Sequence, residues 1–165
     1  MKSKLDSNCN RNFMKNLIPK DFDYAKYLKI YGLNILLGEE NTPLNPSLKD
    51  IKPVNFSVDI NNKDPFPCEY DDLTRLHYIC IKRKVATILE FGLGKSTVIF
   101  GNALKINKKN HYDYCKKHLR RKEFYECHSI DNYENWIEEC RKIIPVDLLE
   151  EGFIKLHYSN ISTGT

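Results

Sequence analysis

Two short segments of this 165-residue chain combine glycine, hydroxyl and acidic residues at spacings that suit ligand binding. Residues 90–97 read Glu-Phe-Gly-Leu-Gly-Lys-Ser-Thr, and Asp131 follows 41 positions after Glu90. Gly92 and Gly94 carry no Cβ that would keep a ligand from the backbone, and the start of a following helix directs free N–H groups at it. An acidic residue at the end of the next strand can accept hydrogen bonds from both hydroxyls of a ribose. The pattern predicts a pocket for a nucleoside-containing cofactor at the carboxyl ends of two strands.

The same residues resemble a known family. Residues 88–97 (ILEFGLGKST) resemble the first motif of class I S-adenosylmethionine-dependent methyltransferases, and residues 129–132 (SIDN) with Trp136 resemble the second. The resemblance covers about residues 65 to 158. It implies a Rossmann-like fold, S-adenosyl-L-methionine as the cofactor, and transfer of its methyl group to an acceptor that the sequence does not identify.

The resemblance also implies roles for single residues. Glu90 would hold the methionine amino group, and the backbone at Gly92 and Gly94 would lie along the methionine and ribose portions. Asp131 would bind the ribose hydroxyls, and Asn132 would lie beside the adenosine. No catalytic residue can be carried over and no metal is implied. The expected cofactor-binding residues are Glu90, Phe91, Gly92, Leu93, Gly94, Ser96, Thr97, Asp131, Asn132 and Trp136, the last belonging either to the core or beside the adenine.

The 41 positions between Glu90 and Asp131 are roughly twice the usual spacing in such units. A basic stretch lies between them, and a surface insertion there would account for the excess. Lys105 to Glu123 contains eight basic and two acidic residues, whereas the whole chain has a net charge of +4. This stretch is either a solvated surface loop or a surface for nucleic acid or another polyanion, in which Tyr112 and Tyr114 could stack on bases.

Other interpretations of the glycine turn stay open. A P-loop NTPase needs a glycine where Leu89 stands. An NAD-dependent oxidoreductase favours glycine or alanine at the position of Thr97. The glycines could also form only a tight turn, with Asp131 capping the next helix together with Glu134. A non-catalytic module that binds a nucleoside cofactor or a polyanion is the main alternative to an enzyme.

The elements that must position these residues follow from apolar periodicity. They alternate between helix and strand, which predicts an α/β fold with parallel strands, namely a Rossmann-like three-layer sandwich. Pro145 is expected to end the third helix. The helices are expected at 71–80, 96–104 and 136–144, the last with Trp136, Ile137, Cys140, Ile143 and Ile144 on one face, and the strands at 85–91, 124–130 and 153–158.

The chain is expected to divide at residue 64. Residues 1–64 would form a leader and an accessory arm, with a short helix between Tyr24 and Leu36 and an extended part containing Val54, Phe56 and Val58. Residues 65–165 would form the N-terminal half of the methyltransferase domain. The sequence ends shortly after the third strand, so we interpret it as a fragment. A second interpretation is self-association through the exposed edge of the sheet.

Composition favours a globular protein, with 41% hydrophobic and 29% charged residues. No apolar run reaches about 18 residues and the N-terminus is polar, so neither a membrane span nor a signal peptide is expected and a cytoplasmic location is favoured. The six cysteines form no C-x-x-C pair, so no metal site is expected. Buried histidine is expected at position 77, packing or hydrogen-bonding histidines at 128 and 157, and buried reduced thiols at Cys80, Cys127 and Cys140.

Overall fold

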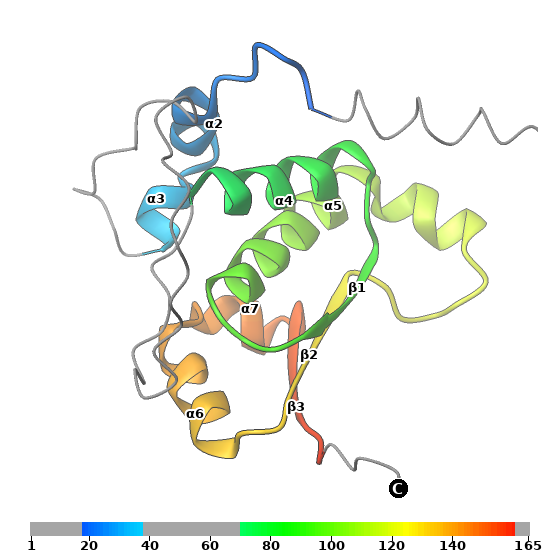
Figure 1. Ribbon diagram of the computed structural model, residues 1–165. Coiled ribbons are helices and arrows are strands. Elements are labelled where there is room, and N and C mark those ends of the chain that lie inside the picture. The colour runs from blue at the N-terminus through cyan, green and yellow to red at the C-terminus, as the bar shows by residue number, and fades with distance from the viewer. Residues whose placement is uncertain (1–17, 38–69, 161–165) are drawn as a thin grey trace, which may run out of the picture.

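The computed structural model describes residues 18–37 and 70–160. Helices and strands alternate in the second range, as predicted, and two short helices form the first (Figure 1). Within the expected leader and arm of residues 1–64, the structure describes only residues 18–37, so the extended part and the boundary at residue 64 lie outside the described residues. The helices are α2 (Tyr24–Tyr31), α3 (Leu33–Leu36), α4 (Tyr70–Lys82), α5 (Lys95–His118), α6 (Glu134–Ile143) and α7 (Val146–Glu150), and the strands are β1 (Thr87–Phe91), β2 (Glu126–Asp131) and β3 (Ile154–Tyr158).

The described sheet has three parallel strands in the order β1-β2-β3. The register aligns Glu90 with Ser129 and Phe91 with Ile130, and it aligns Asp131 with Tyr158. This confirms an α/β architecture with parallel strands. Because the strands run in one direction, the carboxyl ends of β1 and β2 lie at the same edge, where the glycine turn and Asp131 were expected to meet.

One face of the sheet packs against helices and forms the main core. Side chains from alternate strand positions, Cys127 and Ile154 among them, pack against Val98 and Leu104 of α5 and against Leu148 of α7. Side chains at the intervening positions point to the opposite face. On that face, Leu89 is 59% exposed and Phe91 is 80% exposed. The described residues therefore form a sheet layer with helices on one face, and the third layer of the expected sandwich stays a prediction.

Helix α5 is much longer than the sequence pattern indicated. The expected helix ended at Leu104 and a surface loop followed, but α5 continues through the basic stretch to His118 and has 24 residues. The loop prediction was wrong because two interior contacts hold this end of the helix. The amide of Asn107 donates to the carbonyl oxygens of Cys80 and Val85, both at 3.0 Å, and Cys115 is buried. Most of the long segment between Glu90 and Asp131 is therefore helical.

A second core cluster joins α2 and α3 to α4 and α5. It contains Leu28, Leu33, Leu73 and Ile99, all buried. The predicted helix between Tyr24 and Leu36 is confirmed, although Gly32 divides it into α2 and α3 by adopting the left-handed region at φ 61°. This cluster fixes α4 across α5 (Figure 1).

Helix α6 ends before Pro145, as expected, and a further short helix, α7, begins just after it. The sequence pattern did not predict α7. Ile137, Cys140 and Ile144 are buried, but the expectation for Ile143 was wrong because its side chain is 54% exposed. At the end of a helix a shift of about one residue moves a side chain from the apolar face to solvent.

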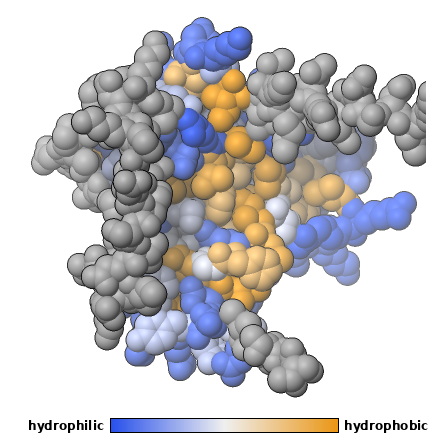
Figure 2. All heavy atoms as spheres, in the orientation of Figure 1, coloured by the Kyte–Doolittle hydropathy of each residue, from blue (hydrophilic) through white to orange (hydrophobic). Residues whose placement is uncertain are grey.

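The visible surface of the molecule varies in polarity. Figure 2 shows hydrophobic side chains in the middle of the view, and hydrophilic side chains at the right, where the end of α5 projects in Figure 1. No helix within the described ranges is both long and apolar enough to cross a membrane.

Candidate functional site

The glycine turn joins the end of β1 to the start of α5. Gly92 has φ 87°, in the left-handed region that L side chains rarely adopt, and its N–H donates to the carbonyl oxygen of Ile130 at 2.8 Å. A Cβ built on Gly92 or on Gly94 would meet no atom within 4 Å. The space over the turn is therefore open, so a ligand can approach the backbone there.

Glu90 is the acceptor at the centre of a cluster of hydroxyl groups. Its Oε1 accepts from the Ser96 hydroxyl at 2.6 Å, and its Oε2 accepts from the hydroxyls of Thr97 at 2.8 Å and Ser129 at 2.6 Å. The Thr97 hydroxyl in turn accepts from the N–H of Gly94 at 3.1 Å. Glu90 thus ties β1, the first turn of α5 and β2 together, and it fixes the shape of the glycine turn.

Ser129 is a site residue that the sequence interpretation did not single out. It is fully buried and stands opposite Glu90 in the register of β1 and β2. A signal for it exists in the sequence, because Ser129 lies two positions before Asp131 and so points to the same face of its strand. A polar residue on the core-facing side of a strand needs a polar partner, and the acidic residue at the end of β1 supplies it.

Asp131 at the end of β2 contacts the glycine turn directly. Its Oδ2 accepts from the N–H of Leu93 at 3.2 Å, and its Oδ1 accepts from the N–H of Tyr133 at 2.9 Å. Asp131 does not form the expected capping box with Glu134, since Tyr133 occupies the N-cap position of α6, but its contact to the N–H of Tyr133 does hold the residue at which that helix begins. A carboxylate has about four acceptor positions, so Asp131 retains room for further donors.

Trp136 closes the other side of the turn. Its indole N–H donates to the carbonyl oxygen of Leu93 at 2.9 Å, which leaves the half-buried ring against the turn. Asn132 is exposed beside Asp131. Phe91 follows Glu90 in the strand and its side chain is on the opposite, exposed face, so only its backbone belongs to the turn.

The structure therefore gathers most of the expected residues in one place. The residues of this candidate site come from the end of β1, the glycine turn, the start of α5, the end of β2 and the first turn of α6. The side chain of Phe91 lies apart from it. The residues joined by the contacts above are Glu90, Gly92, Leu93, Gly94, Ser96, Thr97, Ser129, Asp131 and Trp136.

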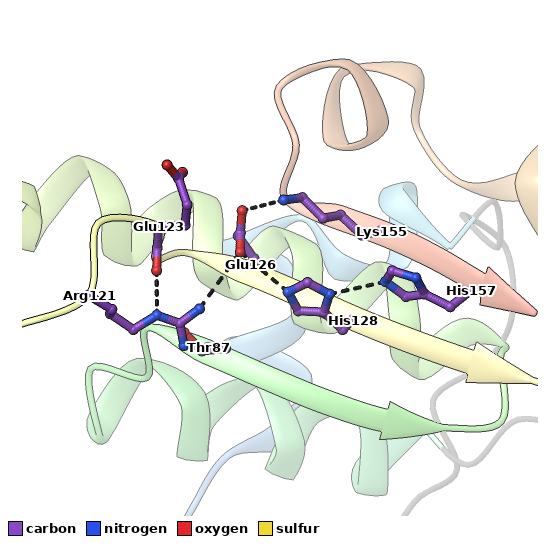
Figure 3. Close-up of polar contacts among 7 residues, drawn as sticks. All are labelled: Thr87, Arg121, Glu123, Glu126, His128, Lys155 and His157. Carbon is purple, nitrogen blue, oxygen red and sulfur yellow. Dashed lines mark hydrogen bonds and ion pairs between the residues drawn. The ribbon is translucent and has the colours of Figure 1, made fainter. Parts of the chain in front are cut away.

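A second polar cluster lies on the opposite face of the sheet (Figure 3). The Glu126 carboxylate accepts from Lys155 and from His128 Nε2, and His128 Nδ1 lies 3.0 Å from His157 Nε2. Lys155, followed by His128, lowers the pKa of Glu126. The prediction that both histidines serve packing or hydrogen bonding is confirmed, because their rings are stacked at 5.2 Å.

The buried thiols offer no nucleophile. Cys80, Cys127 and Cys140 are buried as predicted, and burial raises their pKa to about 11, about 12 and about 11 respectively. Thiols with such a raised pKa stay protonated at neutral pH and react slowly. Within the described part of the chain, no three histidine, cysteine or carboxylate side chains gather in a way that would hold a metal ion.

We compared the chain with protein-family models, curated proteins and solved structures. No protein-family model, no curated protein and no solved structure matches the chain.

Proposed function

We propose that the chain binds S-adenosyl-L-methionine at the glycine turn and belongs to a Rossmann-like S-adenosylmethionine-dependent methyltransferase. One observation carries the proposal. The glycine turn after β1 and the carboxylate at the end of β2 lie in contact, with Asp131 accepting from the N–H of Leu93. A glycine turn and an acidic residue at the ends of neighbouring parallel strands form the usual site for the ribose and its attached group.

The residues present fit this cofactor. The open space over Gly92 and Gly94 admits a ligand along the backbone. Asp131 has acceptor positions left for the ribose hydroxyls. Glu90 already accepts hydrogen bonds from the hydroxyls of Ser96, Thr97 and Ser129, so its main role is to hold the turn in shape. The methionine amino group would bind at the acceptor position of the carboxylate that these hydroxyls leave open.

When bound, the cofactor supplies a methyl group on a positively charged sulfur, which an acceptor O, N or C nucleophile attacks. The role of the chain's own residues is to bind and orient this cofactor. Asp131 would bind the ribose, Trp136 holds the turn through Leu93 and would flank the adenine, and Asn132 lies exposed beside Asp131. The acceptor would be positioned by residues that this proposal does not assign.

Calorimetric titration of the folded chain with S-adenosylhomocysteine tests the proposal. We expect binding that weakens at least tenfold in Asp131→Ala, because two hydrogen bonds to the ribose are lost. Binding should also weaken in Gly92→Val, because a β-branched residue does not tolerate φ 87° and its side chain fills the space over the turn. Asp113→Ala, an exposed acidic position far along α5, is the matched control and should bind like the wild type.

The outcomes separate the competing functions. Equal binding by the wild type, Asp131→Ala and Gly92→Val would refute the proposed site. Tighter binding of magnesium-ATP would favour a P-loop function, and tighter binding of NAD would favour an oxidoreductase. No binding of any nucleoside ligand would favour an interaction module.

A further inference from the structure

The far end of α5 is a strongly charged surface that the cofactor site does not use. Beyond Leu104 the buried residues of the helix are Asn107 and Cys115, and residues 116–123 are all exposed. This end projects away from the sheet (Figure 1) and is hydrophilic in Figure 2. We call it the basic tip and define it by six residues: Lys108, Lys109, Lys116, Lys117, Arg120 and Lys122.

The positive charge of the basic tip is not neutralised within the described chain. Lys105 contacts Asp147 and Glu151, and Arg121 contacts Glu126, so the two remaining basic residues of the stretch are paired. None of the six residues of the basic tip forms an ion pair with another described residue. Five of the six residues are exposed, whereas Lys108 is half-buried with its ammonium 4.9 Å from the centre of the Phe153 ring. Unpaired lysines and arginines gathered along one end of a helix attract a polyanion and give binding that weakens with salt.

Two exposed aromatic rings favour a nucleic acid over other polyanions as the ligand of this surface. Tyr112 is 41% exposed and Tyr114 is 67% exposed, and both lie among the basic residues. Lys109, Tyr112 and Lys116 recur at intervals of three and four residues, so they line one face of α5, and the Lys116 ammonium lies 5.9 Å from the centre of the Tyr112 ring. Tyr114 is two positions further along and lies on a different face, where its ring contacts the ring of His118 with centroids 4.4 Å apart. A base can stack on a tyrosine ring while lysines on either side contact its phosphates.

We propose that the basic tip, with Tyr112 and Tyr114, is a binding surface for single-stranded nucleic acid. Unpaired strands present bases that can leave their neighbours and stack on the tyrosines, whereas the bases of a duplex are enclosed between the two strands. The proposal is independent of the cofactor. Lys116 lies 21 residues after Lys95 at the glycine turn, which is about 32 Å along the helix axis.

Fluorescence anisotropy with a labelled 15-nucleotide single-stranded RNA of mixed sequence tests the proposal. Neutralising four positions together (Lys109→Gln, Lys116→Gln, Lys117→Gln and Arg120→Gln) should weaken binding about 100-fold at low salt. It should also make the slope of log affinity against log salt shallower by about 3, because each phosphate contact contributes about 0.7 for a single strand. The matched control neutralises four exposed lysines elsewhere, at Lys20, Lys26, Lys29 and Lys142, and should bind nearly as the wild type does.

A second pair of variants tests the stacking separately from the charge. Tyr112→Leu and Tyr114→Leu leave the net charge unchanged, and leucine has a high helix propensity. Each variant should weaken RNA binding about tenfold. Circular dichroism and S-adenosylhomocysteine titration of every variant report whether the fold and the remote glycine turn are unchanged. A loss of RNA binding in a variant with an intact circular dichroism spectrum supports the proposal, and the titration serves as a second check if the wild type binds S-adenosylhomocysteine.

Several results would overturn it. These are tyrosine variants that bind like the wild type, a control variant as weak as the four-position variant, or heparin and double-stranded RNA bound as tightly as the single strand. A wild type that binds neither single-stranded RNA nor single-stranded DNA at low salt would also overturn it. Single-stranded DNA of the same sequence shows whether the 2′-hydroxyl contributes, and binding of either single strand supports the inference. Failure here leaves the proposed cofactor site untouched, and failure of the cofactor titration leaves the RNA result untouched.

Discussion

Glu90 shows how one carboxylate sets the geometry of the candidate site. Three hydroxyl donors from two other elements converge on its two oxygens. An acceptor with several donors is costly to remove because each donor left without a partner loses its hydrogen bond.

We predict that Glu90→Ala lowers the free energy of unfolding by about 2 to 3 kcal/mol, because three hydroxyls lose their acceptor. Glu90→Gln should cost less, since its carbonyl oxygen still accepts and its amide nitrogen fails to. Urea unfolding followed by circular dichroism measures both. A Glu90→Ala variant as stable as the wild type would show that these hydroxyls find other partners.

His77 is a buried histidine held neutral by its surroundings. Its Nε2 and Nδ1 lie 2.9 Å from Asn102 Oδ1 and from the Tyr27 hydroxyl respectively. A neutral ring satisfies both contacts, with Nε2–H donating to Asn102 and Nδ1 accepting from Tyr27. Burial lowers the pKa of His77 from 6.5 to about 4. The prediction of a satisfied core histidine is confirmed.

The lowered pKa predicts a loss of stability in acid. The unfolded chain takes up a proton below pH 6.5, whereas the folded chain resists it until about pH 4, so stability present above pH 6.5 falls as the pH is lowered. The contribution of His77 to this loss is on the order of 3 kcal/mol. Urea unfolding at pH 7 and pH 4.5 should show a smaller loss in His77→Phe than in the wild type. Equal losses would contradict the assignment.

At the residue scale, the sequence predicted which residues belong to the candidate site but not which side chains contact one another there. Glu90, Gly92 and Asp131 were identified from their order at the ends of expected strands, and the structure brings them together. Ser129 was missed because its role depends on the register of β2 against β1, which spacing alone does not specify. The side chain of Phe91 was included because a motif does not state which face of a strand each residue occupies.

At the scale of elements, α5 connects most of the fold. Its first turn holds the glycine turn, its middle packs on the sheet, and Asn107 holds the connection between α4 and β1. Gly101 of α5 lies directly against Ile154 of β3 and Leu148 of α7. A Cβ there would lie 2.6 Å from Ile154 Cδ1, 2.8 Å from Ile154 Cγ1 and 3.1 Å from Leu148 Cδ1.

We predict that Gly101→Ala destabilises the fold by about 1 kcal/mol, since overpacking of about 1 to 3 kcal/mol exceeds the gain of about 1 kcal/mol from replacing glycine in a helix. Asn110→Ala, at an exposed position of the same helix, is the control and should raise stability slightly. Thermal unfolding measures both. A rise in melting temperature for Gly101→Ala would mean that α5 can move away from β3.

Element order was predictable and element length was not. Apart from the short α7, which was missed, apolar patterns predicted the strands and helices of residues 70–160 in their correct order, because those patterns follow from burial on one face. The outer part of α5 carries few apolar residues, so periodicity ended at Leu104 while the helix continued to His118. Two interior contacts, through Asn107 and Cys115, keep it in place, and both depend on tertiary structure.

At the scale of the whole molecule, β1 is an edge strand of the described sheet. Edge strands present unpaired backbone groups that favour association with another strand. Leu89 and Phe91 add exposed apolar area on this strand. Self-association through this edge stays a prediction.

Sedimentation velocity over a range of concentrations tests that prediction. The wild type should form reversible dimers, and Leu89→Lys with Phe91→Lys should sediment as a monomer, because lysine on an edge strand opposes pairing. Ile30→Lys, which changes an equally exposed residue on α2, is the control and should dimerise like the wild type. A wild type that is monomeric throughout would contradict the prediction.

The length of α5 sets a distance between the two proposed sites. Stacked nucleotides advance by about 3.4 Å each, so the roughly 32 Å from the glycine turn to Lys116 correspond to about nine nucleotides. If a nucleic acid held at the basic tip were also the methyl acceptor, the modified base would stand at a fixed offset from the bound segment. α5 would then act as a ruler that selects a position along the strand without reading its sequence.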